Sequence, residues 1–205
     1  MAGQITPIEF YFDFPSPYSY LASTQLPKLA AAHGVTITYH PFRILELMKQ
    51  VGNRPTTVES KAKGRYAGAD LTRWVRRYGV AFERNPNRGS FDFTLLERLV
   101  LVANEQGRGG ACVHAIFPGV WASTDNLGDK AVLAQRLDAA GLPGAAMIEQ
   151  ASGSDYAAKL DDVTAKAAER GVFGAPTIFV GDEMFFGNDR LDFVAEALAA
   201  AKKAA

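Results

Sequence analysis

The stretch from Phe12 to Leu21, FDFPSPYSYL, constrains the fold more than any other part of the chain. Before it lies the run 8–12, short, apolar and aromatic, which is typical of a buried strand. After it, leucine and alanine recur at helical spacing until Gly34, a residue that can end a helix. Pro17 suits the first turn of that helix because its missing N–H would have no partner there. Ser16 is therefore expected at a strand-to-helix junction, at the positive end of a helix dipole, where anions bind.

The spacing from Ser16 to Ser19 resembles the Cys-x-x-Cys redox motif at the start of the first helix in thioredoxin-like proteins, with serine at both cysteine positions. A site that stabilises a thiolate would remain, but the thiol would have to come from a ligand. The simpler interpretation is that Ser16 is only a helix N-cap, a role that serine fills well.

Composition excludes several classes of function. The chain has 205 residues, with 22 basic and 22 acidic side chains, so charge gives no reason to expect nucleic acid or an anionic membrane as partner. No apolar run approaches membrane-spanning length, and the first residues lack the pattern of a signal peptide. The single cysteine, Cys112, rules out an internal disulfide and a cysteine-based metal cluster, and we expect it to be a small buried apolar residue. These features predict a soluble cytoplasmic protein.

The order of the predicted elements indicates the fold class. A strand at 35–40 follows the first helix, which makes a βαβ unit with parallel strands, and Pro27 should kink that helix. Near the C-terminus, the sequence predicts a hairpin at 177–186 and then a closing helix from 189 to 203. Helical periodicity fills the region between, at 44–49, 58–78, 92–106, 111–121, 129–140, 143–151 and 155–170.

This order predicts an α/β thioredoxin-like fold, with a large all-helical domain inserted after the second strand. The thioredoxin-like domain would comprise residues 1–43 and 171–205, and the inserted domain residues 44–170. The structural alternative is an all-helical protein with two hairpins. Within the insertion, 111–121 is apolar nearly all round and is expected at the centre of a bundle. The helix 58–78 should pack through one face, with Tyr66, Leu71, Trp74, Val75 and Tyr78.

Two loops near the C-terminus could carry chemistry. The sequence before the third strand includes Ala175-Pro176, where a proline flanked by Gly and Ala suggests a tight turn that a cis bond would satisfy. An ordinary trans proline at a strand start is the alternative. Asn188 and Asp189 open the last helix, where they can act as caps, hold a polar end of a ligand, or do both. Asn53 by itself fits turn chemistry, and Lys63 by itself a solvated helix face.

Taken together, several motifs resemble those of the 2-hydroxychromene-2-carboxylate isomerase family, which is related to kappa-class glutathione transferases. The resemblance covers residues 8 to about 198 and is most specific in its first and last blocks. Its motifs are FDF-x-SPYSYL at 12–21, GN-x-P at 52–55, DL-x-RW at 70–74, GVFGAPT at 171–177 and GDEM-x-x-GNDRL at 181–191.

The resemblance implies a glutathione-dependent isomerase of naphthalene-type aromatic breakdown. It would interconvert 2-hydroxychromene-2-carboxylate and trans-o-hydroxybenzylidenepyruvate, as a homodimer. It also implies roles for single residues. Ser16 would activate the thiol of glutathione, and Asn53 would bind glutathione near that thiol and the substrate. Lys63 would lie near the substrate, and Tyr18 would belong to the substrate pocket. The glutathione backbone would pair with Ala175 beside Pro176, and its γ-glutamyl end with Asn188 and Asp189.

Two other functions share these motifs. A kappa-like transferase that conjugates small electrophiles would use the same first and last blocks. A non-catalytic thioredoxin-like module would bind glutathione and turn nothing over. A disulfide oxidoreductase is disfavoured because the chain has no second cysteine for exchange.

Overall fold

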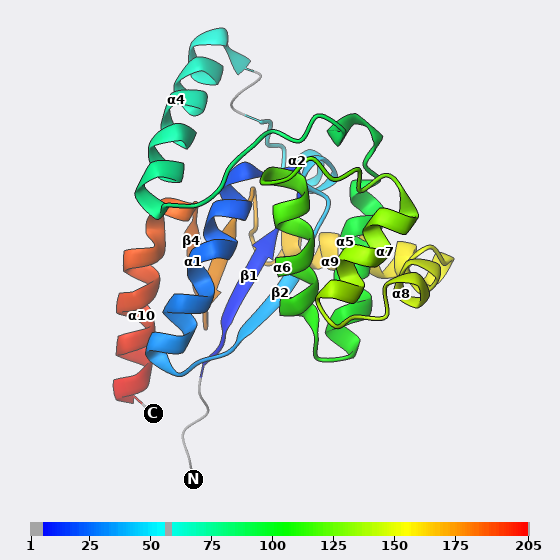
Figure 1. Cartoon of the computed structure of the whole chain (residues 1–205). Helices are drawn as coiled ribbons and strands as arrows, with labels where there is room; N and C mark the ends of the chain where they lie inside the picture. The colour runs from blue at the N-terminus through cyan, green and yellow to red at the C-terminus, as the bar shows by residue number, and fades with distance from the viewer. Residues whose placement is uncertain (1–5, 56–58, 205) are drawn as a thin grey trace.

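A computed structural model describes residues 6–55 and 59–204. A four-stranded sheet in the order β2-β1-β3-β4 lies at its centre (Figure 1). The strands are β1 (Ile8–Phe12), β2 (Ile37–Pro41), β3 (Thr177–Val180) and β4 (Glu183–Phe186). Strand β1 pairs in parallel with β2 and antiparallel with β3, and β3 pairs antiparallel with β4. The predicted parallel pair and C-terminal hairpin are therefore confirmed, and with them the α/β thioredoxin-like fold.

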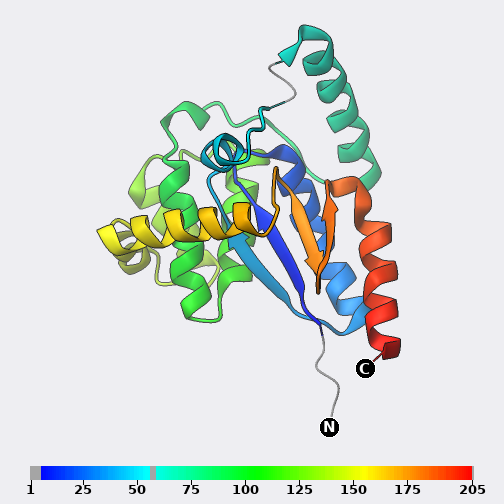
Figure 2. The ribbon, with the colours of Figure 1, turned by 180° about the vertical axis from the view of Figure 1, so that it is seen from behind.

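The two faces of the sheet pack against different helices because side chains alternate along β1. Ile8, Phe10 and Phe12 are fully buried in the main core, on the face covered by α1 (Pro17–His33) and α10 (Leu191–Ala204). Tyr11 points to the opposite face, where a smaller apolar cluster lies beneath α2 (Ile44–Gln50) and α9 (Ser154–Glu169) (Figure 2).

Between β2 and β3 the chain is helical. The elements are α2 (Ile44–Gln50), α4 (Lys61–Tyr78), the short η1 (Arg88–Ser90), α5 (Phe93–Glu105), α6 (Gly109–Trp121), α7 (Lys130–Ala139), α8 (Gly144–Ala151) and α9 (Ser154–Glu169). Helices α5 to α8 gather beside the β2 edge (Figure 1), and most of α6 is buried, as its apolar composition predicts. The separation of these helices into a domain of their own stays a prediction.

Helix α1 begins and ends as its sequence predicts. Ser16 is the N-cap, Pro17 occupies the first turn, and Gly34 ends the helix with φ of 70°, a left-handed conformation that glycine adopts without strain. Pro27 lies inside the helix and cannot donate to the carbonyl of Ser23. His114 of α6 compensates, because its Nε2 lies 3.4 Å from that oxygen and donates to it as the Nε2–H tautomer.

Helix α4 extends beyond the rest of the molecule (Figure 1) and has no fully buried residue. Leu71, Trp74, Val75 and Tyr78 pack partly against the core, as predicted. Tyr66 does not, since 65 % of it is exposed, and its predicted place on the packed face is wrong. The reason is that only the C-terminal half of α4 reaches the core. Residues 56–58, where the sequence predicts the start of this helix, lie outside the described residues.

No helix in the described ranges combines the length and apolar character needed to cross a membrane.

Candidate functional site

A cavity of ≈ 430 Å³ opens where the C-terminal end of β1 meets the start of α1. The Ser16 turn, α2, α4, the loop before β3 and the segment after β4 supply its walls. The apolar lining side chains include Ile44, Leu45, Met48, Pro55, Trp74 and Phe186. The polar ones are Ser16, Tyr18, Asp70, Asn188 and Asp189. An apolar pocket with a few convergent polar groups is the usual form of a small-molecule site.

Ser16 lies at the end of this cavity with its hydroxyl at the N-terminus of α1. Its Oγ accepts a hydrogen bond from the Ser19 amide at 3.1 Å, which makes it the N-cap, and donates to the carbonyl of Ala175 at 3.4 Å. The second of these bonds is long and therefore weak, so the hydroxyl can turn to donate to a ligand. Ser19, the second serine of the motif, is fully buried and does not line the cavity. Of the two serines, only Ser16 can meet a ligand.

The turn that carries Ser16 is held at four successive backbone carbonyls. The carbonyl of Phe12 accepts from the Phe42 amide at 3.0 Å, and that of Asp13 from the Ser16 amide at 3.1 Å. The next two are held by side chains from the insertion. They are the carbonyl of Phe14, which accepts from Trp121 Nε1 at 2.9 Å, and that of Pro15, which accepts from Arg88 Nη2 at 2.9 Å. Each buried carbonyl has a fixed partner, which fixes the position of the serine.

The loop before β3 lies directly opposite Ser16. The bond between Ala175 and Pro176 is cis, so the predicted cis turn is confirmed and the trans alternative is wrong. The carbonyl of Pro176 accepts from the Gly187 amide at 2.9 Å, which ties this loop to the segment after β4. Gly174 allows close packing, since a Cβ there would lie 2.7 Å from the Phe186 ring.

Asn188 and Asp189 form the third side of the site. Asn188 is only 3 % exposed, yet its Nδ2 has no hydrogen-bond partner among the described residues. A buried amide N–H without a partner is costly, and a ligand acceptor placed there would satisfy it. Gly187 has φ of 104°, and a side chain on it would collide with the Asp189 carboxylate. That carboxylate pairs with Arg190 and is partly exposed.

Two predicted site residues lie outside the cavity lining. Asn53 donates from Nδ2 to the carbonyl of Phe173 at 2.8 Å, so it braces the loop that carries Ala175. Lys63 is exposed in the first turn of α4 and forms an ion pair with Glu59. The structure therefore brings together Ser16, Ala175, Pro176, Asn188 and Asp189, while Asn53 supports them and Lys63 is separate from them.

Tyr18 and Asp70 form the polar part of the wall between α1 and α4. The Tyr18 hydroxyl lies 3.2 Å from the carbonyl of Ala67 and 3.4 Å from Asp70 Oδ2, and it can donate to either. Burial and the nearby Asp70 carboxylate raise the pKa of Tyr18 to about 12. The phenol is therefore protonated at neutral pH. The charged side chains in the lining, Asp70 and Asp189, are both acidic.

Three residues that shape the site carry no role in the sequence analysis. Arg88 stacks over Trp121 at 4.3 Å while it donates to Pro15, and both come from the insertion. Asp13, although part of the first motif, is 2 % exposed and accepts from the Ile44 amide through Oδ2 at 2.8 Å. An acidic residue within an aromatic run was the one signal available for Asp13. Arg88 and Trp121 lie too far along the chain for any local pattern to connect them to Ser16.

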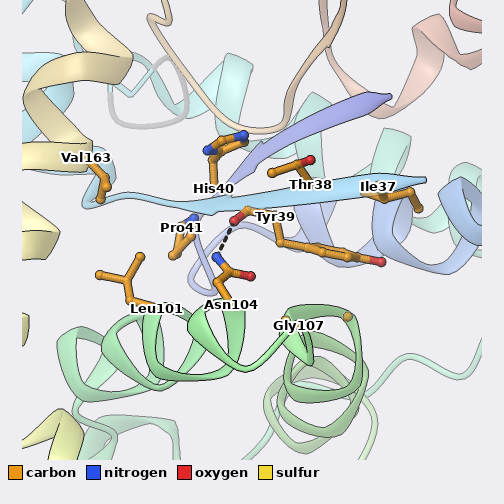
Figure 3. A pocket seen from close by; sticks show the side chains of 11 residues that line it. Ile37, Thr38, Tyr39, His40, Pro41, Leu101, Asn104, Gly107 and Val163 are labelled. Atoms are coloured by element: carbon orange, nitrogen blue, oxygen red, sulfur yellow. Dashed lines mark hydrogen bonds between the residues drawn. The ribbon is translucent and has the colours of Figure 1, made fainter. Parts of the chain in front are cut away.

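A second cavity, of ≈ 310 Å³, lies along the outer edge of β2 beside α5 (Figure 3). There Asn104 donates to the carbonyl of Tyr39 at 2.8 Å, which satisfies one group of the open strand edge. His40 is its one titratable side chain apart from Tyr39, and His40 Nε2 lies 3.2 Å from a carboxylate oxygen of Glu9. Fewer ionisable side chains line this cavity than the Ser16 cavity.

Comparison with known proteins agrees with this geometry. A family model described as "DSBA-like thioredoxin domain" matches residues 7–199. A 2-hydroxychromene-2-carboxylate isomerase of Sphingobium xenophagum is 36 % identical over 188 residues, covering 91 % of this chain and 95 % of that protein. Glutathione S-transferase kappa 1 of Caenorhabditis elegans is 29 % identical over 204 residues, covering 93 % and 90 % of the two chains.

Among solved structures, a 2-hydroxychromene-2-carboxylate isomerase superposes with a TM-score of 0.83 at 32 % identity, covering 94 % of each chain. The chain therefore belongs to the DsbA-like thioredoxin family and, within it, to the family of 2-hydroxychromene-2-carboxylate isomerases.

Proposed function

We propose that this protein is a glutathione-dependent isomerase that interconverts 2-hydroxychromene-2-carboxylate and trans-o-hydroxybenzylidenepyruvate in the breakdown of naphthalene-type aromatic compounds. The observation that carries the proposal is a serine hydroxyl at the N-terminus of α1, opposite a cis-proline loop, in a cavity with apolar walls. Such a site would stabilise a thiolate, and the thiol of Cys112 is fully buried elsewhere.

The residues present fit glutathione. The unpartnered Asn188 Nδ2 is a donor for the carboxylate of the γ-glutamyl end, and the Asp189 carboxylate suits the amino group beside it. The Ala175 backbone next to the cis-proline can pair with the cysteinyl backbone. Ser16 would then face the sulfur and donate to it. When bound, glutathione would supply a thiolate that adds reversibly to the conjugated double bond of the ring-opened substrate, so that this bond, single while the sulfur is attached, can rotate before the thiolate leaves again.

Protein groups would account for the remaining steps. The N-terminus of α1 and the Ser16 hydroxyl would stabilise the negative charge of the thiolate. They would therefore lower the pKa of the glutathione thiol from about 8.5 toward neutral pH. Trp74, Leu45 and Phe186 offer apolar surface to an aromatic ring and exclude water from it. The protonated Tyr18 can donate to a substrate oxygen. The charged side chains of the lining are acidic and would repel a substrate carboxylate. We therefore assign Lys63, a cation outside the lining, to that carboxylate.

The proposal extends to assembly and location. We infer a homodimer, which size-exclusion chromatography with light scattering would test. We place the enzyme in the cytoplasm, because reduced glutathione is maintained there.

Two measurements test the function. Glutathione should raise the melting temperature, with a gain of about 2.7 kcal/mol in the free energy of unfolding at a hundred times its Kd. No thermal shift at millimolar glutathione would contradict the proposal. An ultraviolet assay should then show conversion of the chromene substrate that depends on catalytic amounts of glutathione.

The second candidate is a kappa-like transferase, favoured by the resemblance to the nematode protein. It predicts stoichiometric consumption of glutathione with a chloro-dinitrobenzene electrophile and no conversion of the chromene. Binding without turnover of either compound would instead indicate a non-catalytic module.

A further inference from the structure

Two carboxyl groups lie in the core behind the Ser16 turn. Asp13 follows β1 and Glu97 belongs to α5, and each is only 2 % exposed. The two carboxyl groups lie within hydrogen-bonding reach of each other. Asp13 Oδ1 and Glu97 Oε2 have no other hydrogen-bond partner in the described part of the chain. Two ionised carboxylates cannot share such a site, so the pair retains a proton.

The charges around the pair do not neutralise it fully. Arg88 faces Asp13, and Arg43 faces Glu97, but so does the carboxylate of Asp92. The two arginines are partly committed to other groups, Arg43 to Asp161 and Arg88 to the carbonyl of Pro15. Burial is the largest effect on both carboxyls, and it raises the pKa of each.

Asp13 connects the two walls of the cavity. Its backbone carbonyl accepts from the Ser16 amide at 3.1 Å, and its side-chain Oδ2 accepts from the Ile44 amide at 2.8 Å, in the first turn of α2. Ser16 and Ile44 both line the cavity, whereas Asp13 and Glu97 do not. Asp13 therefore links the serine turn to the first turn of α2.

We propose that Asp13 and Glu97 are positioning residues: they share one proton, and in that state they fix the positions of the Ser16 hydroxyl and of the first turn of α2 in the cavity wall. Loss of the shared proton would leave two negative charges in contact, and one carboxylate would have to move. Movement of Asp13 would displace Ser16 and Ile44 together. The catalytic meaning of this inference rests on the proposed function, but the coupling between the two walls does not.

The coupling can be tested without ligand, by following backbone amide signals by NMR between about pH 5 and pH 9, where raised carboxyl pKa values fall. In the wild type, the Ser16 and Ile44 signals should move together in one titration. Glu97→Gln keeps a donor to Asp13 but has no proton to lose, so this shared titration should disappear. Glu105→Gln, on the exposed part of the same helix, is the matched control and should titrate like the wild type.

Either of two results would overturn the inference: static Ser16 and Ile44 signals in the wild type, or the same titration in Glu97→Gln. If Glu97→Gln does not fold, Asp13→Asn serves in its place, because its amide can accept from Ile44 and donate to Glu97. It should likewise abolish the shared titration.

The catalytic consequence is tested with glutathione and the chromene substrate. Glu97→Leu should lower kcat/KM roughly tenfold to a hundredfold through a displaced Ser16, while the Kd for glutathione changes little. In the wild type, the rate should change with pH over the same range as the shared amide titration of the ligand-free protein. In Glu97→Gln this pH dependence of the rate should be absent. If the wild type neither binds glutathione nor converts the chromene substrate, the proposed function is refuted. The amide titration then decides by itself whether Asp13 and Glu97 share a proton. If the Kd for glutathione rises in Glu97→Leu by the same factor as kcat/KM falls, a positioning role is contradicted.

Discussion

At the scale of single residues, Ser16 has two roles that a mutation can separate. As a helix cap it accepts from the Ser19 amide, and as a ligand group it would donate to a thiolate. A hydrogen bond to a charged acceptor contributes roughly 1.5–3 kcal/mol. Ser16→Ala should therefore raise the thiol pKa of bound glutathione by about one to two units, at ~1.36 kcal/mol per unit.

The isomerase rate of Ser16→Ala at neutral pH should fall roughly tenfold to a hundredfold and recover in part as the pH rises. Thiolate absorbance in the ultraviolet measures the shift directly. Ser154→Ala, at an exposed serine of α9, is the control and should change neither quantity. If Ser16 is only a cap, its mutant loses about 1 kcal/mol of stability and keeps the wild-type thiol pKa.

Lys63 provides a second test at this scale. It is exposed, so its attraction for a substrate carboxylate is screened by water and salt. Lys63→Ala should raise KM a few-fold, as expected of an exposed charge pair worth about 0.2–1 kcal/mol, and leave kcat and glutathione affinity nearly unchanged. Lys63→Arg should restore the wild-type KM, and the effect should weaken with salt. An unchanged KM in Lys63→Ala would limit Lys63 to its surface pair with Glu59.

At the scale of elements, two tyrosine hydroxyls join α4 to the rest of the molecule by hydrogen bonds, in addition to its apolar packing. Tyr78 at its C-terminal end donates to the carbonyl of Asn188 at 2.6 Å, and Tyr18 of α1 contacts its middle turn. Tyr78→Phe leaves that carbonyl without its donor, which should lower the free energy of unfolding by about 1 kcal/mol. It should also weaken glutathione binding, because the mutation frees the Asn188 backbone.

Tyr66→Phe is the matched control for this change, on the same helix but exposed. Denaturant melts and calorimetric titration with glutathione would measure both effects. Equal affinities in Tyr78→Phe and the wild type would show that Asn188 keeps its position without α4.

Local patterns predicted the elements well because most boundaries are marked by residues with one physical role. Gly34 and Gly79 end helices in the left-handed conformation, and Asp92 and Asp129 cap α5 and α7, as their chemistry suggests. The same patterns found the Ser16 turn and the cis-proline loop. Tyr66 was misplaced because periodicity indicates an apolar face but not how much of it another element covers.

The remainder of the site could not be predicted because it depends on contacts between distant segments. Arg88 meets Pro15 across 73 positions, and Trp121 meets Phe14 across 107. A charged residue in a loop and an aromatic residue in an apolar helix are ordinary in sequence. Their functions appear only when the insertion folds back on the turn.

At the scale of the whole molecule, the buried acid pair should be visible in the pH dependence of stability. Both Asp13 and Glu97 have pKa values raised by burial, so the folded state binds the proton more tightly than the unfolded state. The free energy of unfolding should therefore fall as the pH rises from about 4, where unfolded carboxyls titrate, toward the raised values, at up to about 1.4 kcal/mol per pH unit for one proton.

Other groups act in the opposite direction, notably Glu9, whose pKa is lowered mainly by its hydrogen bond with Arg170. The difference between the wild type and Glu97→Gln removes these common contributions. Urea melts from about pH 4 to pH 8 should show that difference declining as the pH rises. A difference that stays constant with pH would mean that the pair retains no proton in the folded state.

The pairing of β1 with β3 has a consequence for how the chain is made. The aromatic strand 8–12 leaves the ribosome long before its antiparallel partner, which begins only at residue 177. At about 5–20 residues per second, one edge of β1 waits roughly ten to thirty seconds for that partner. Throughout this time the nascent chain presents an unpaired strand edge of high β-propensity, in which Glu9 is the single charged residue. The segment that positions Ser16 is thus synthesised well before β3, its antiparallel partner, and is among the last to be enclosed.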